Sequence, residues 1–172
     1  MKKMLSLLLM VIIAGIVYSQ EITKPAALEN ANIDSFVDDA FAIYDQTTTI
    51  STELDNSDAA ITELEGNESP SADDIKIVSA KVKENKAKLE GLQNDAVALS
   101  GKSEQVLTGA KSISPKTKAP KAIKNVNTSI KVLNESKNKI PELLKKAADQ
   151  EKRIEVIKGK TKVNNTIEES LE

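Results

Sequence analysis

Residues 123–154 read IKNVNTSIKVLNESKNKIPELLKKAADQEKRI, and this stretch decides the fold class. One position in it repeats at alternating spacings of three and four residues, and most members of the repeat are apolar. The members are Ile123, Val126, Ile130, Leu133, Lys137, Ile140, Leu144, Ala147, Glu151 and Ile154. Because a helix turns once in about 3.6 residues, this spacing predicts a long α-helix with an apolar stripe, packed as in a coiled coil.

Two segments closer to the N-terminus carry the same spacing, one from Ile33 to Leu64 and one from Ile75 to Ile113. Further apolar residues beside each stripe widen it, as expected for a helix with two neighbours. Aromatic residues make up only 2% of the chain, which favours an elongated bundle over a compact core. We therefore predict an all-α, elongated antiparallel three-helix bundle with coiled-coil-like packing. Its domain is expected over residues 29–159, with helices at about 29–65, 72–113 and 117–158.

Helix-breaking residues separate the three segments. Residues 66–70 (GNESP) end the first, and Pro115 and Pro120 bound the break before the third. Connections this short favour antiparallel neighbours. Ser71, three residues before Asp74, resembles a capping box for the second helix. Gly159 is expected to end the third helix, which leaves residues 160–172 as a flexible tail.

Some residues inside the helices weaken them. Gly91, Gly101 and Gly109 each cost the second helix up to about 1 kcal/mol relative to Ala. Pro141 removes a backbone hydrogen bond from the third helix and is expected to kink or restart it. We therefore expect bent helices.

The charged members of the stripes predict a register. Turns centred near residues 69 and 116 would place Lys137 opposite Asp95 and Glu151 opposite Lys81. These two pairings test how the second and third helices align.

The first 19 residues resemble a signal peptide. Met1-Lys2-Lys3 is followed by an apolar run to Val17 and then by Tyr18-Ser19-Gln20, which predicts cleavage after Ser19 and an N-terminal linker over 20–28. The run is shorter than the roughly 20 residues of a spanning helix. An uncleaved N-terminal anchor is the alternative. No other stretch predicts a transmembrane segment. Because a cleaved signal peptide directs export, we expect an extracytoplasmic protein, either periplasmic or secreted.

Charge is distributed unevenly along the chain. The totals, 24 basic and 26 acidic residues, are nearly balanced. Residues 20–70, however, carry one Lys and 12 acidic residues, whereas residues 111–162 carry 15 basic and five acidic residues. The first and third helices would run parallel in the bundle, so their attraction favours this arrangement over pairing of like helices.

The sequence offers little for catalysis. It contains no His and no Cys, so the usual general base, thiol nucleophile and zinc ligands are missing. Ser136 and Lys139 have the S-x-x-K spacing of serine-lysine acyl enzymes, but a Lys-rich helix produces this spacing by chance. Acidic clusters such as Asp34, Asp38 and Asp39 lack a calcium-loop pattern and indicate a solvated helix face. We expect no enzyme activity, cofactor or bound metal.

One basic stretch is a candidate anion-binding site. It contains Lys111, Lys116, Lys118, Lys121 and Lys124. Lysines near a helix start oppose the helix dipole, so helix formation does not account for them. They would suit anionic lipid or glycan. Nucleic acid is not expected, because arginine forks and interleaved aromatic residues are missing. The alternative is that these lysines serve solubility and attraction to the acidic first helix.

These observations predict a structural or protein-interaction module in the cell envelope, whose partner is an envelope protein. One alternative is an anionic-surface binding protein that uses the basic third helix and the turn before it. A second is a periplasmic holdase-type chaperone, an analogy of architecture alone with exported helical chaperones. The partner's identity and a homo-oligomeric state stay open at this point.

Overall fold

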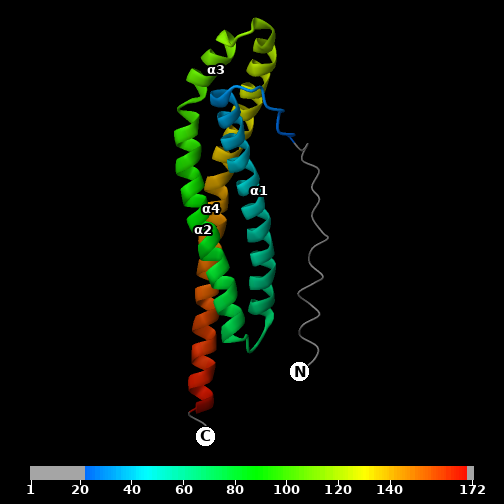
Figure 1. The fold of residues 1–172 in the computed structure, drawn as a ribbon. Helices are drawn as coiled ribbons and strands as arrows, with labels where there is room; N and C mark the ends of the chain where they lie inside the picture. The colour runs from blue at the N-terminus through cyan, green and yellow to red at the C-terminus, as the bar shows by residue number, and fades with distance from the viewer. Residues whose placement is uncertain (1–21, 170–172) are drawn as a thin grey trace.

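The computed structural model describes residues 22–169 and is helical throughout its regular structure (Figure 1). Four α-helices and one short 3-10 helix follow in order: α1 (Ala31–Gly66), α2 (Ala72–Ser100), α3 (Ser103–Ser112), η1 (Lys116–Lys118) and α4 (Ala119–Glu169). The all-α prediction is confirmed. The predicted signal peptide, residues 1–19, lies outside the described residues. Within residues 22–169 no helix has both the length and the apolar character needed to cross a membrane.

The long helices lie side by side. In Figure 1, α1 and α4 run in the same direction and α2 runs in the opposite one. The α4 helix contacts both α1 and α2, and these two also contact each other. The α3 helix covers the end of the molecule where α4 begins.

The core follows the predicted stripes. Its largest fully buried apolar side chains all occupy predicted stripe positions and come from α1, α2 and α4: Leu54, Ile61, Leu89, Leu133, Ile140 and Ile154. Burying a side chain of this size stabilises the fold by about 1.5–3 kcal/mol. The core is thus one continuous apolar seam along the length of the molecule.

The start of α1 has a capping arrangement that the sequence analysis missed. The Asn30 side chain accepts a hydrogen bond from the Ile33 backbone N–H at 3.1 Å, and Asp34 accepts from Leu28 at 2.8 Å and from Asn30 at 2.9 Å. One orphan backbone donor of the first turn, the Ile33 N–H, is thereby satisfied, and Asp34 binds two backbone N–H groups that precede the helix. The predicted capping box at α2 is wrong: Ser71 is its N-cap residue, but its side chain makes no capping hydrogen bond.

The second predicted helix, 72–113, is divided at Gly101-Lys102 into α2 and α3. Here the Lys102 N–H bonds to the Leu99 carbonyl at 3.0 Å, a tighter turn than an α-helix makes. Counted from the Lys81–Glu53 ion pair, antiparallel packing brings the first residue of α1 level with Ser103. The break therefore falls at the level where α1 begins, so a straight continuation of α2 beyond it would have no part of α1 beside it.

The third predicted helix is longer than expected. The α4 helix continues through Pro141 and past Gly159 to Glu169, so the predicted end at 158 is wrong. Pro141 is exposed, and its buried neighbours Ile140 and Leu143 hold the helix on both sides. A single Gly costs a helix only about 1 kcal/mol. Residues 160–169 of the predicted tail are consequently helical.

The predicted register of α2 against α4 is wrong by five residues. Glu151 pairs with Lys86 at 2.6 Å, and Lys81 pairs instead with Glu53 of α1 at 3.1 Å. Lys137 and Asp95 form no ion pair within residues 22–169. The Lys86–Glu151 pair centres the reversal between residues 118 and 119, later than residue 116. The prediction assumed one unbroken helix up to a single turn, whereas α2 ends at Ser100 and the separate helix α3 lies between it and the connection.

Candidate anion-binding crown

We use the name crown for the end of the molecule built from residues 22–30, α3, η1 and residues 119–125 of α4. The trunk is the part of the packed helices over residues 40–100 and 126–161, and residues 31–39 of α1 join the two. In Figure 1 the crown is the end that carries α3. Apolar residues hold it together, since Ala110 of α3, Ile113 of the connection and Ala122 of α4 are all buried.

Residues 22–30, the strap, pack against the crown before α1 begins. Leu28 is buried. The Asn125 side chain donates to the Ala26 carbonyl at 3.0 Å, and Lys118 Nζ donates to the Leu28 carbonyl at 3.3 Å. Glu29 has a φ of 61°, a left-handed conformation that non-glycine residues adopt at a cost. Residues 22–28, the described part of the predicted linker, are thus held against the helices by hydrogen bonds and by the buried Leu28 side chain.

The structure places all five candidate lysines on the crown. Lys111 belongs to α3, Lys116 and Lys118 to η1, and Lys121 and Lys124 to α4. Four of them are exposed, and within residues 22–169 their side chains form no ion pair or hydrogen bond: Lys111, Lys116, Lys121 and Lys124.

Lys118 differs from the other four lysines. Besides its bond to the strap carbonyl, its Nζ lies 3.4 Å from Glu29 Oε2. This contact fastens the strap to η1, so Lys118 has a structural role in addition to its charge. This role could not be predicted from the sequence, because the partner lies 89 residues away.

Two cations of α4 in the trunk are paired with acidic residues of α1. Arg153 of α4 forms a two-pronged contact with Glu65 of α1, at 2.8 Å from Nε and 2.7 Å from Nη2, and also contacts Asp58 and Thr62. Lys146 pairs with Asp55. The predicted attraction between the acidic and basic helices is thereby confirmed in the trunk.

Hydrogen bonding between Arg153 and Glu65 shifts the titration of both groups. It raises the pKa of the Arg153 guanidinium above its ordinary value and holds the pKa of the Glu65 carboxyl below 4.5. Both shifts favour the charged forms. The pair therefore stays ionised across the neutral range.

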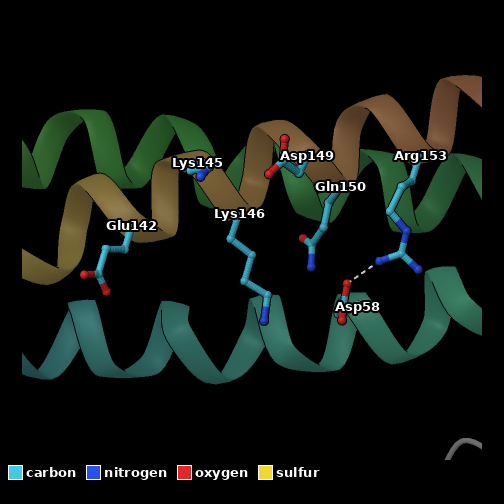
Figure 2. Close-up of a pocket in the computed structure, with 7 residues that line it drawn as sticks. All are labelled: Asp58, Glu142, Lys145, Lys146, Asp149, Gln150 and Arg153. Atoms are coloured by element: carbon cyan, nitrogen blue, oxygen red, sulfur yellow. Dashed lines mark hydrogen bonds and ion pairs between the residues drawn. The ribbon is translucent and has the colours of Figure 1, made fainter.

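A shallow groove of about 350 Å³ lies between α1 and α4 in the trunk (Figure 2). Figure 2 shows Lys146, Gln150 and Arg153 directed from α4 toward α1. The groove is lined by Asp58, Glu142, Lys145, Lys146, Asp149, Gln150 and Arg153. Its acidic and basic residues are equal in number, and Lys146 and Arg153 are already paired, so the groove offers no uncompensated charge to a ligand.

The acidic clusters of α1 serve the fold. Asp34 caps the helix start, Asp38 pairs with Lys24 at 2.9 Å, and Asp55 and Asp58 pair with α4. Among the described residues no three His, Cys, Asp or Glu side chains are grouped closely enough to hold a metal ion. The crown is therefore a surface on which exposed lysines gather without an ion pair to any residue in the range 22–169. Comparison of the whole chain with known protein families, curated proteins and solved structures found no match.

Proposed function

We propose that this chain is an exported, non-enzymatic protein that acts as a structural or protein-interaction module in the cell envelope. In this proposal residues 1–19 direct export. The mature chain is an elongated bundle of three helical segments: α1, α2 with α3, and α4. The trunk supplies a rigid body, and the crown supplies the contact surface.

One observation carries the proposal. From Lys111 to Lys124 the chain has five lysines and no acidic residue, and four of these lysines are exposed and have no ion-pair partner in the part of the chain that the structure describes. Unpaired lysines of the trunk, such as Lys139 and Lys145, alternate along α4 with Glu135, Glu142 and Asp149. A concentrated, unbalanced charge at one end of a long molecule suits an anionic partner.

A second candidate function is binding to an anionic lipid or polysaccharide surface. Lysine is a compact point charge that attracts diffuse negative charge without the paired geometry an arginine offers. The crown contains five lysines between Lys111 and Lys124 and no arginine. Its lysines are therefore better suited to a charged surface than to recognition of one carboxylate.

A holdase-type chaperone is supported less well. Such a protein needs contiguous apolar surface for unfolded clients. The large exposed apolar residues among those described are Ile77, Val97 and Val156. Ile77 and Val97 lie about 30 Å apart along α2, at 1.5 Å per residue, so the three residues do not form one contiguous patch.

Vesicle binding separates the candidates. The protein is mixed with vesicles of anionic phospholipid and with vesicles of zwitterionic phospholipid, at low and high salt. If the crown binds a charged surface, the protein should bind the anionic vesicles and not the zwitterionic ones. This binding should weaken steeply as the salt concentration rises. Replacing Lys111, Lys116, Lys121 and Lys124 with Gln removes about 1 kcal/mol per lysine near the surface, a loss of roughly a hundredfold or more.

The matched control replaces four exposed trunk lysines that form no ion pair: Lys76, Lys83, Lys139 and Lys145. It carries the same change of charge and should retain binding. Lys118 is left intact in both variants because it holds the strap. Equal losses in both variants would mean that net charge alone binds the vesicles, and the crown would lose its role.

A protein partner gives a different result. The protein captured from its own envelope fraction should then retain one partner at high salt, and the crown variant should lose it. Export is tested separately, because the mature chain recovered from outside the cytoplasm should begin at Gln20.

A further inference from the structure

Buried polar side chains of the helices fall into two groups. Thr47, Ser57, Ser129 and Ser136 each donate to the backbone carbonyl four residues earlier, and Asn125 donates to the strap. Asn85 and Gln150 differ. Among the described residues, Asn85 Nδ2, Asn85 Oδ1 and Gln150 Oε1 are the buried side-chain atoms that lack a hydrogen-bond partner.

Asn85 and Gln150 lie close together along the axis of the trunk. The next residues, Lys86 and Glu151, form an ion pair at 2.6 Å across the antiparallel helices α2 and α4, so Asn85 and Gln150 lie on either side of this contact, two residues or about 3 Å apart along the axis. Gln150 Nε2 donates to the Leu54 carbonyl of α1 at 2.7 Å, and Figure 2 shows its amide directed toward α1. Polar groups from α1, α2 and α4 thus meet in one layer of an otherwise apolar seam.

Leaving these atoms unpaired is costly. Asn85 is 0% exposed and Gln150 is 1% exposed, so bulk solvent does not reach them. A buried amide group without a partner loses its hydration and gains nothing in exchange. The layer therefore requires a small polar ligand that fits between the helices.

The unpaired atoms define the ligand. Two are acceptors, Asn85 Oδ1 and Gln150 Oε1, and one is a donor, Asn85 Nδ2. A water molecule has two O–H donors and lone pairs to accept, and buried waters typically make about three hydrogen bonds. We propose that Asn85 and Gln150 bind one internal water molecule, which bridges α2 and α4 in the centre of the trunk.

This hydrated layer selects one register of α4. A slip of α4 by one heptad would bring Leu143 or Ile157, both buried in the seam, to the level of Asn85. The Asn85 amide would then face apolar side chains and lose the bridging water. Polar groups in apolar helix seams fix register in this way at a cost in stability.

The proposal is tested by magnetic relaxation dispersion of solvent water, which counts waters held longer than the protein tumbles. The wild-type protein is compared with Asn85→Leu and Gln150→Met. Each variant should lose the signal of about one long-lived water. The thermal midpoint of Asn85→Leu should stay unchanged or rise by roughly 2–4 °C, because the polar group and its water leave together.

Asn125→Leu is the matched control. Its amide is also buried but bonds directly to the Ala26 carbonyl, so this variant should keep the water signal and lower the thermal midpoint. Should Asn85→Leu fail to fold, Gln150→Met gives the same reading. A water signal that is absent from the wild type, or that persists in both variants, overturns the proposal.

Discussion

The trunk and the crown share α4, yet the lysines of α4 meet different surroundings in each. In the trunk, Lys146 lies against Asp55 of α1. In the crown, Lys121 and Lys124 are exposed and form no ion pair among residues 22–169. The difference shows that a basic helix does not have one role along its length. A lysine's contribution depends on which acidic residue the neighbouring helix brings to its level.

The strap engages two acidic residues at the crown end of α1. Asp34 accepts hydrogen bonds from Leu28 and Asn30, and Asp38 pairs with Lys24. The strap thus takes up acidic groups that could otherwise neutralise the nearby lysines. Its own Glu29 pairs with Lys118, so the strap leaves Lys111, Lys116, Lys121 and Lys124 as the lysines of the 111–124 run that have no ion pair among residues 22–169.

The first prediction compares the loss of a core side chain in the trunk with the same loss in the crown. Leu89 of the trunk is 0% exposed, and Leu89→Ala should lower the free energy of unfolding by about 2–5 kcal/mol. The counterpart in the crown, Leu107→Ala, removes a side chain that is only partly buried and should cost under about 2 kcal/mol. Urea unfolding measures both. Equal losses would show that the crown belongs to the same cooperative core as the trunk.

The second prediction concerns the paired cations. Arg153→Gln removes contacts to Glu65, Asp58 and Thr62 together and should cost about 1–2 kcal/mol, since exposed pairs contribute under about 1 kcal/mol each. Lys139→Gln is the control, because Lys139 is exposed on the same helix and has no ion pair. Its unfolding free energy should stay within about 0.5 kcal/mol. A similar loss in both variants would remove the distinction between paired and unpaired cations.

The third prediction concerns how the contact between Arg153 and Glu65 makes the stability of the fold depend on pH. Arg153 holds the pKa of Glu65 below 4.5, so this carboxyl stabilises the fold above its ordinary pKa, and the contribution is lost as pH falls through the lowered value. Thermal midpoints measured from about pH 6 to about pH 3 should fall. The fall should be shallower in Arg153→Gln. Parallel curves for the two proteins would show that Glu65 gains nothing from Arg153.

Sequence periodicity predicted the core well. Leu54, Leu89 and Ile140 are fully buried where the three-four spacing places them, because the spacing itself determines which face of a helix is apolar. The break at Gly101 was not predictable in the same way. Gly91 and Gly109 cost a helix as much as Gly101 does, and only Gly101 lies near the level where α1 begins. That level depends on the register of two helices.

The crown was predictable in composition but not in detail. The run from Lys111 to Lys124 is evident in the sequence, and the structure gathers it at one end of the molecule. The separation of Lys118 from the other four lysines depends on a strap carbonyl 90 residues earlier. The pairing of Asn85 with Gln150 likewise required the α2–α4 register, which the sequence analysis placed five residues away.

The smallest expected effect is that of the crown lysines on stability, and it tests most directly whether these lysines differ from the paired cations of the trunk. Replacing Lys111, Lys116, Lys121 and Lys124 with Gln should change the free energy of unfolding by no more than about 0.5 kcal/mol, because no described contact is lost. A small increase is the expected sign: four like charges no longer repel one another, and Lys121 no longer opposes the dipole at the start of α4. Urea unfolding at low salt measures it. A loss of more than about 1 kcal/mol would mean that these lysines stabilise the fold, and the crown would then need no ligand to account for its charge.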